Sequence, residues 1–97
     1  MRYDFQQLLA EAKEILDEKD KAREEALKLS REITRSSAFS IRALHKDELY
    51  EAEKLLGEAR ERHNELLSLL EGHPDLRHSG FVNDAEKELV EASFILS

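Results

Sequence analysis

The 97-residue sequence contains no cysteine and no tryptophan, one proline, three glycines and few aromatic residues. Without cysteine, the chain forms neither disulfides nor thiolate metal sites. It has no apolar run of membrane-spanning length, and its first residues, MRYDFQQLLAEAKE, lack the continuous apolar core of a signal peptide. The sequence therefore argues against a disulfide-stabilised secreted domain and a membrane span, and we expect a cytoplasmic protein.

Acidic residues outnumber basic ones, and the formal net charge is −7 at pH 7. This excess argues against a generally basic nucleic-acid-binding surface and against binding to anionic membranes, but it leaves room for a local basic stripe. Hydrophobic residues make up 40% of the chain and charged residues 38%, and Leu, Ala, Glu, Lys and Arg are abundant. Such a composition is typical of helices that pack along narrow seams and often complete their core with other chains.

The longest element that the sequence predicts is one helix over residues 3–45, because the stretch between Tyr3 and His45 contains no glycine and no proline. Small and apolar residues recur along it by alternating steps of four and three, which is the spacing of a heptad seam: Leu8, Ala12, Ile15, Ala22, Ala26, Leu29 and Ile33, with Lys19 as an interruption. A helix of about 40 residues is about 60 Å long. No compact domain of this size has that diameter, so we expect other helices along its length.

Two shorter helices are expected over residues 47–71 and 81–97, so the chain is one all-α domain of long antiparallel helices. Asp47 is the expected N-cap of the second helix, and Gly72-His73-Pro74 ends it. Gly57 lies inside this helix, where it costs about 1 kcal/mol relative to alanine. We expect it to mark the close approach of a neighbouring backbone.

The third helix carries two candidate metal ligands and catalytic carboxylates, Glu88 and Glu91. By steps of four and three, Glu88 shares a face with apolar and small residues: Phe81, Ala85, Ala92 and Ile95. Buried carboxylates are costly unless a cation or a base compensates them. Mg²⁺ takes such oxygen ligands and can activate water for phosphodiester cleavage. The alternative is that both glutamates form ion pairs with Arg or Lys on a neighbouring helix. The apolar end of this helix, SFILS, is expected to be covered by a partner or by further chain.

A basic stripe is expected on the second half of the first helix, where Arg31, Arg35, Arg42 and Lys46 recur by steps of four, seven and four. Small residues surround it. In an acidic protein, such a stripe could follow a phosphate backbone while the small residues allow close approach. The alternative is a solvated face that pairs with glutamates of a neighbour.

None of the four histidines has the spacing of a metal-binding motif, and the sequence contains no nucleophile elbow and no phosphate-binding glycine loop. His63 falls in the apolar seam of the second helix. At such a position, a hydrogen-bonded core histidine is a simpler interpretation than a metal ligand.

Two segments resemble a known family. Residues 29–46 read LSREITRSSAFSIRALHK, which resembles the first-helix signature LSREITxxSxxxIxxLHK of the translin superfamily, in particular its translin-associated factor X branch. The segment Glu88–Ala92, ELVEA, is similar to the ExVEA-type motif of that branch. The short chain and the short connection between the first two helices suggest an archaeal type. The resemblance spans nearly all of this chain but only the N-terminal half of the family.

The resemblance implies an all-α fold that assembles into a hollow homo-oligomer, commonly an octamer. It also implies binding of single-stranded RNA or DNA inside the shell and Mg²⁺-dependent endoribonuclease activity in the factor X branch. Glu88 and Glu91 match the acidic metal ligands of that branch. Arg31 and Lys46 match basic positions of the family, whereas Arg35 and Arg42 do not. A further acidic ligand of the family comes from a later helix, so we expect the metal site of this chain to be incomplete and the chain alone to be inactive.

Three functions are therefore open. The first is a single-stranded nucleic-acid-binding protein whose complete form is a ribonuclease. The second is a structural helical module that oligomerises through its heptad seams and has no catalytic activity. The third, a small metal-binding bundle of the ferritin type, is weaker because the sequence has no Glu-x-x-His motif. Salt-dependent binding of single-stranded RNA would distinguish the first from the second.

Overall fold

The computed structural model describes residues 4–97, which form three α-helices and one short 3₁₀ helix: α1 (Phe5–His45), α2 (Leu49–Gly72), η1 (Pro74–Leu76) and α3 (Gly80–Leu96). No strand occurs in this part of the chain, so the expected all-α class, with one long helix and two shorter ones, is confirmed. The expected helix start at residue 3 lies outside the described residues. The carboxylate of Asp4 caps α1 by accepting a hydrogen bond from the backbone N–H of Gln6 at 3.0 Å.

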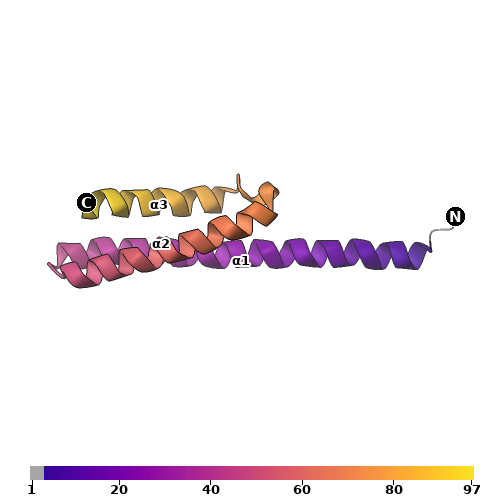
Figure 1. The fold of residues 1–97 in the computed structure, drawn as a ribbon, viewed down its shortest axis with the longest axis horizontal. Helices are drawn as coiled ribbons and strands as arrows, with labels where there is room; N and C mark the ends of the chain where they lie inside the picture. The colour runs from indigo at the N-terminus through magenta and orange to yellow at the C-terminus, as the bar shows by residue number, and fades with distance from the viewer. Residues whose placement is uncertain (1–3) are drawn as a thin grey trace.

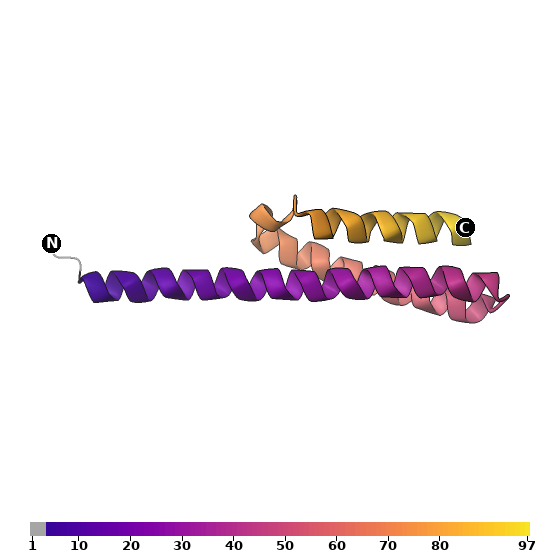
Figure 2. The same ribbon diagram turned by 180° about the vertical axis from the view of Figure 1, so that it is seen from behind.

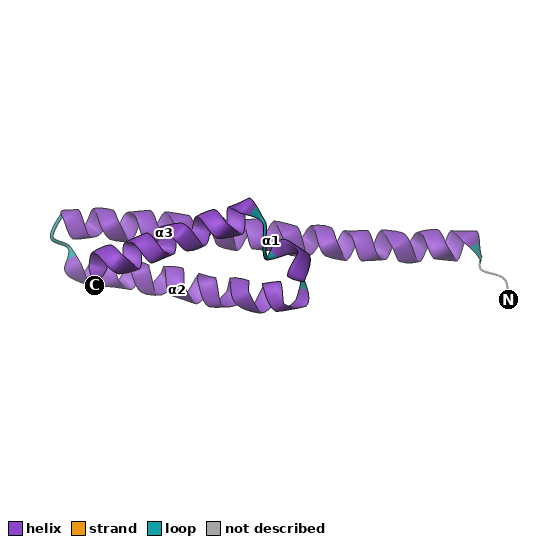
Figure 3. Cartoon of the chain, turned by 90° about the horizontal axis from the view of Figure 1, so that it is seen from above, coloured by secondary structure: helices purple, strands orange, loops and turns teal. Residues whose placement is uncertain are grey.

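The three helices form an elongated bundle that measures 69 × 18 × 16 Å. α1 and α2 form an antiparallel hairpin, and α3 folds back so that it runs parallel to α1 (Figures 1 and 2). Seen from above, α3 lies over the hairpin, while the first half of α1 projects beyond both other helices (Figure 3). Residues 5–21, here called the α1 arm, are all exposed. None of the described helices combines the length and the apolar character needed to cross a membrane.

The core lies where the three helices meet and combines leucine, isoleucine and valine side chains with alanines and serines, and the small residues are concentrated on α1. The buried residues of α1 are Ala22, Ala26, Leu29, Ser30, Ile33, Ser37, Ser40 and Ala43. The Oγ of Ser40 donates a hydrogen bond to the carbonyl of Ser37 at 2.7 Å. Buried alanines on α2 and α3 face this seam: Ala52, Ala59, Ala85 and Ala92. Because alanine and serine leave little bulk at these contacts, α2 and α3 both pack directly against α1.

The turn between α1 and α2 differs from the expectation for Asp47. The N-cap of α2 is Glu48, and Asp47 has a φ of 60°, in the left-handed region. The N–H of Glu48 donates to the carbonyl of Ala43 at 2.9 Å, and the N–H of Asp47 donates to that of Leu44 at 3.0 Å. These two bonds form a Schellman motif, which satisfies the last carbonyls of α1. Asp47 therefore ends the first helix rather than starting the second.

The expectation for Gly57 is wrong. Among residues 4–97, a Cβ atom built on Gly57 would meet no atom within 4 Å outside its own local helix. The close packing of α2 occurs instead at Ala52 and Ala59, which are fully buried. The chain therefore makes its close approach with alanine, which costs less helix propensity than glycine.

Replacing Asp47 with glycine should stabilise the protein. A non-glycine residue in the left-handed region carries a steric cost of about 1 kcal/mol between Cβ and the following carbonyl, and glycine lacks the Cβ. We expect Asp47→Gly to raise the free energy of unfolding by about that amount in urea titrations. Asp47→Ala, which keeps the Cβ, serves as the control and should give no gain. A glycine variant less stable than wild type would contradict this account of the turn.

Candidate nucleic-acid and metal site

The predicted basic residues lie on the solvent side of α1. Arg31, Arg35 and Arg42 are exposed, and Lys46, also exposed, is the C-cap of the helix. At about 100° per residue, these arginines lie on the side of α1 opposite Ile33 and the other buried positions. We call the four residues the basic ridge. Within residues 4–97, no ion pair joins any of them to an acidic group. The ridge is thus a solvated face, but the glutamate partners of the alternative interpretation are not present in the described chain.

An aromatic side chain, not singled out from the sequence, lies within the basic ridge. Phe39 is 41% exposed, and the guanidinium carbon of Arg42 lies 5.2 Å from the centre of its ring. This distance is that of a cation–π contact. The spacing in the sequence could have indicated this contact, because Phe39 follows Arg35 by four residues and precedes Arg42 by three. An exposed ring beside a guanidinium group is a surface on which a base can stack.

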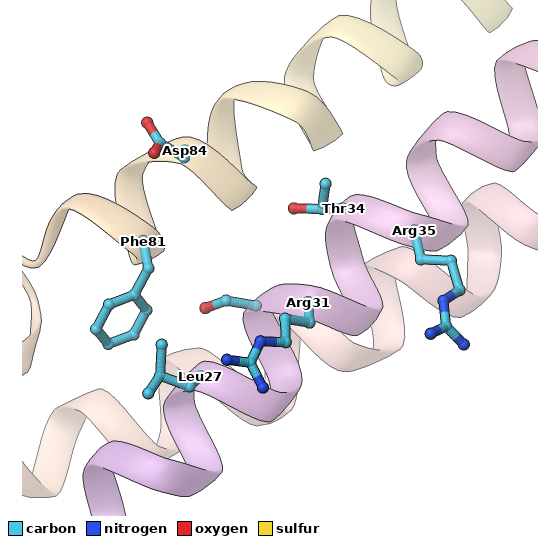
Figure 4. A pocket seen from close by; sticks show the side chains of 7 residues that line it. Leu27, Arg31, Thr34, Arg35, Phe81 and Asp84 are labelled. Carbon is cyan, nitrogen blue, oxygen red and sulfur yellow. The ribbon is translucent and has the colours of Figure 1, made fainter.

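A groove of about 350 Å³ lies between α1 and α3, and we call it the α1–α3 groove. Its lining residues come from both helices: Leu27, Ser30, Arg31, Thr34, Arg35, Phe81 and Asp84. Figure 4 shows Phe81 and Leu27 approaching each other from the two helices, Thr34 on the side of α1 nearest α3, and Arg35 extending away from Phe81. The guanidinium carbon of Arg23 lies 5.3 Å from the centre of the Phe81 ring. The groove thus combines apolar, cationic and anionic side chains.

Glu88 does not occupy the buried seam of α3. The seam consists of Val82, Ala85, Leu89 and Ala92, whereas Glu88 is half-buried and Glu91 is exposed. Two apolar stripes overlap in this helix, and the stripe that contains Leu89 packs because α3 lies over both α1 and α2. The outer face of α3 is not surrounded by other described elements, so Val90 and Phe94 are exposed.

Both candidate ligands share a flank of α3 with Asp84. Asp84 lines the α1–α3 groove, and Glu88 and Glu91 follow it by four and seven residues, so the three carboxylates lie along one flank of the helix. Neither Glu88 nor Glu91 forms an ion pair within residues 4–97. In the same part of the chain, no group of three or more His, Asp or Glu side chains is arranged to hold a metal ion. A hard cation on this flank would therefore need ligands beyond these side chains.

A polar cluster, not anticipated from the sequence, fixes α3 to α2. His63 Nε2 lies 2.9 Å from Glu86 Oε2, and the Arg77 guanidinium donates to Glu86 Oε1 at 2.9 Å. Burial raises the pKa of Glu86, but the hydrogen bonds and positive charges of Arg77 and His63 outweigh this effect and hold that pKa below its ordinary value. An ionised carboxylate only accepts hydrogen bonds, so His63 Nε2 carries the proton. His63 is thus hydrogen-bonded, as the sequence indicated, although it is only half-buried.

Comparison with known proteins finds a relative of unknown function. The chain is 44% identical over 78 residues to an uncharacterized protein of the archaeon Methanocaldococcus jannaschii, and the match covers 79% of this chain and 34% of the relative. The chain therefore spans only about a third of the length of the relative it matches. No family model matches the sequence. No solved structure matches the fold.

The cluster around Glu86 predicts a pH-dependent contribution to stability. We expect Glu86→Gln to lower the free energy of unfolding at neutral pH by about 1 kcal/mol, because charge-assisted hydrogen bonds are lost. A free glutamate titrates near pH 4.3. Since the folded pKa is lower, the contribution of the carboxylate is complete above that value and is lost as the pH falls through the folded pKa. Urea titrations across this pH range should show the free energies of unfolding of the wild type and Glu86→Gln converging as the pH falls. Glu61→Gln, an exposed change on α2, is the control. A stability difference between the two proteins that does not depend on pH would contradict the role of the ionised Glu86 carboxylate.

Proposed function

We propose that this chain is a translin-like subunit that binds single-stranded RNA or DNA along the basic ridge of α1. The observation that carries the proposal is the ridge itself. A chain of net charge −7 keeps Arg31, Arg35, Arg42 and Lys46 together on one exposed helix face, without acidic partners in the described residues. Phosphates are the natural partners of such a face, and binding releases their counterions. Phe39 adds a surface for stacking. A cytoplasmic location is part of the same proposal.

The second part of the proposal is Mg²⁺-dependent cleavage of RNA by a longer form of the protein. It is supported by the position of Glu88 and Glu91, on the flank of α3 that also presents Asp84 to the α1–α3 groove. Carboxylates next to a phosphate-binding face are suited to hold a hard cation between protein and nucleic acid. The relative from M. jannaschii extends well beyond the matched region, which leaves room for further ligands in longer proteins of this type.

The alternative is a structural module that oligomerises and has no catalytic activity. The α1 arm supports oligomerisation. The buried seam residues Ala22 and Ala26 continue in the arm, at the same heptad spacing, as exposed apolar residues: Phe5, Leu8 and Ile15, with Leu9 and Leu16 beside them. A seam of this kind is normally covered by another helix. We therefore propose that the protein is a homo-oligomer under either function. A chain that assembles but does not bind RNA would favour the structural module.

Removing charge from the ridge should weaken binding to nucleic acid. We expect Arg31→Gln combined with Lys46→Gln to reduce the affinity for single-stranded RNA about equally for all sequences. It should also flatten the slope of log K against log salt by about 0.7 per lost phosphate contact. The measurement is fluorescence anisotropy of labelled RNA over a salt series. Lys54→Gln combined with Lys87→Gln changes the net charge equally on exposed positions of α2 and α3, and it should leave the slope unchanged. An unchanged slope in the ridge variant would contradict binding at this face.

Glu88→Gln or Glu91→Gln should remove the response to Mg²⁺. In the metal-free protein, each change relieves the repulsion between carboxylates three residues apart and should raise stability slightly, by about 0.3 kcal/mol. Millimolar Mg²⁺ should raise the melting temperature of the wild type more than that of either variant, with Glu61→Gln as the control. In a longer form, the same changes should abolish Mg²⁺-dependent RNA cleavage but spare RNA binding. Strong EDTA-insensitive cleavage by this chain, or a large loss of metal-free stability in Glu88→Gln, would overturn the metal role.

A further inference from the structure

We propose that the α1–α3 groove holds one unstacked base of the bound strand and favours cytosine over uracil. This inference rests on the proposed binding of a single strand to the basic ridge, and it adds a site that reads the base. Arg31 connects the two, because it belongs to the ridge and also lines the groove. A strand whose phosphates follow the ridge therefore passes the mouth of the groove, and a base that rotates out of the stack can enter it.

The lining of the groove suits a base better than an apolar side chain. Leu27 and Phe81 form an apolar part against which a flat ring can pack (Figure 4). Arg31 and Asp84 add a cation and an anion on the two opposite helices. An apolar occupant would cover both charges without pairing them, at a cost. A nucleotide offers acceptors to the arginine and, on suitable bases, donors to the aspartate.

Ser30 lines the groove and is 4% exposed. Within residues 4–97 its Oγ is covered and has no hydrogen-bond partner, and the same is true of the Oγ of Ser37 in the core. Because both hydroxyls are covered, they belong to the small-residue seam of α1, and the apolar and charged side chains of the lining carry the preference for a base.

Asp84 sets the expected base preference. An ionised carboxylate only accepts hydrogen bonds. Cytosine presents an amino group, which donates, at the position where uracil presents a carbonyl oxygen, and a carboxylate contact to the cytosine amino group is a known form of base recognition. Because Asp84 is exposed at the rim, the discrimination should be modest. We expect about fivefold, at the low end of the range for a direct base contact.

The first test fills the groove. Thr34 lines the groove and is exposed, so Thr34→Leu takes up space without disturbing the core. Binding is measured by anisotropy with short homopolymers of cytidine and uridine. The wild type should bind oligo-C about fivefold more tightly than oligo-U. Thr34→Leu should lower the oligo-C affinity to the oligo-U level, while Thr34→Val, which keeps the volume, should behave as wild type.

The second test changes the contact between Asp84 and the amino group of cytosine. Asp84→Asn exchanges an acceptor for an amide that can both donate and accept, so the ratio of oligo-C to oligo-U affinity should fall to about one, mainly through tighter binding of oligo-U. Asp75→Asn makes the same charge change at an exposed position of η1 outside the groove, and it should preserve the ratio. Circular dichroism melts on each variant report whether the fold is retained.

The outcomes separate this inference from the proposed function. Salt-dependent binding of both homopolymers with equal affinity, unchanged by Thr34→Leu and Asp84→Asn, would overturn the base site and leave the ridge intact. Absence of salt-dependent binding to either homopolymer would overturn both. A preference for oligo-C that persists in Asp84→Asn would assign the selectivity to another part of the protein and overturn the role of Asp84.

Discussion

The arrangement of this molecule depends on the small-residue seam of α1. Ala26, Ser37 and Ser40 present almost no bulk toward the other helices and are essentially fully buried. Close helix approach is possible only with such side chains at the contact, and it allows a 17-residue helix, α3, to lie directly beside α1. The consequence reaches the surface: when the axes are close, residues at the edge of each contact face, such as Arg31 and Asp84, line the same groove.

The packed half of α1 also explains why the α1 arm is helical although most of the arm projects beyond α2 and α3 (Figure 3). An isolated helix of this length is marginal in water because nucleation is costly, whereas extending an existing helix adds one hydrogen bond per residue. The packed half of α1 provides the nucleus, and the arm contains no glycine or proline to interrupt it. The helical stability of the arm therefore depends more than that of the rest of α1 on another chain that covers it. Its exposed apolar residues Leu8 and Ile15 lie at heptad spacing from the buried Ala22.

The sequence predicted the elements better than it predicted their faces. Heptad spacing predicted all three helices, together with the absence of Gly and Pro in the first and Gly72-His73-Pro74 at the end of the second, since these signals are local. These signals did not predict which face of α3 is buried. Glu88 and Leu89 lie on neighbouring stripes, and the packing of α3 on both α1 and α2 buries the stripe that contains Leu89. Asp47 was misassigned because an Asp between two helices can end the first or begin the second, and only the backbone of the turn, with a φ of 60° at Asp47, decides between them. The contact of His63 with Glu86 joins residues 23 positions apart, and no spacing rule anticipates it.

Charge separation links the packing to the proposed chemistry. A uniformly acidic surface would repel a phosphate backbone, but here Arg31, Arg35 and Arg42 lie on α1, and Asp84, Glu88 and Glu91 lie on one flank of α3. The field of the ridge is strongest at its own surface and is screened within about 10 Å, so the phosphates of a strand bound as proposed would lie along the ridge and away from the carboxylates of α3. A divalent cation would remove this repulsion locally, because it can bind carboxylate and phosphate oxygens together. Under the proposed function, the separation of the basic ridge from the carboxylates of α3 would therefore make the position of a bound strand depend on metal, which a mixed surface would not do.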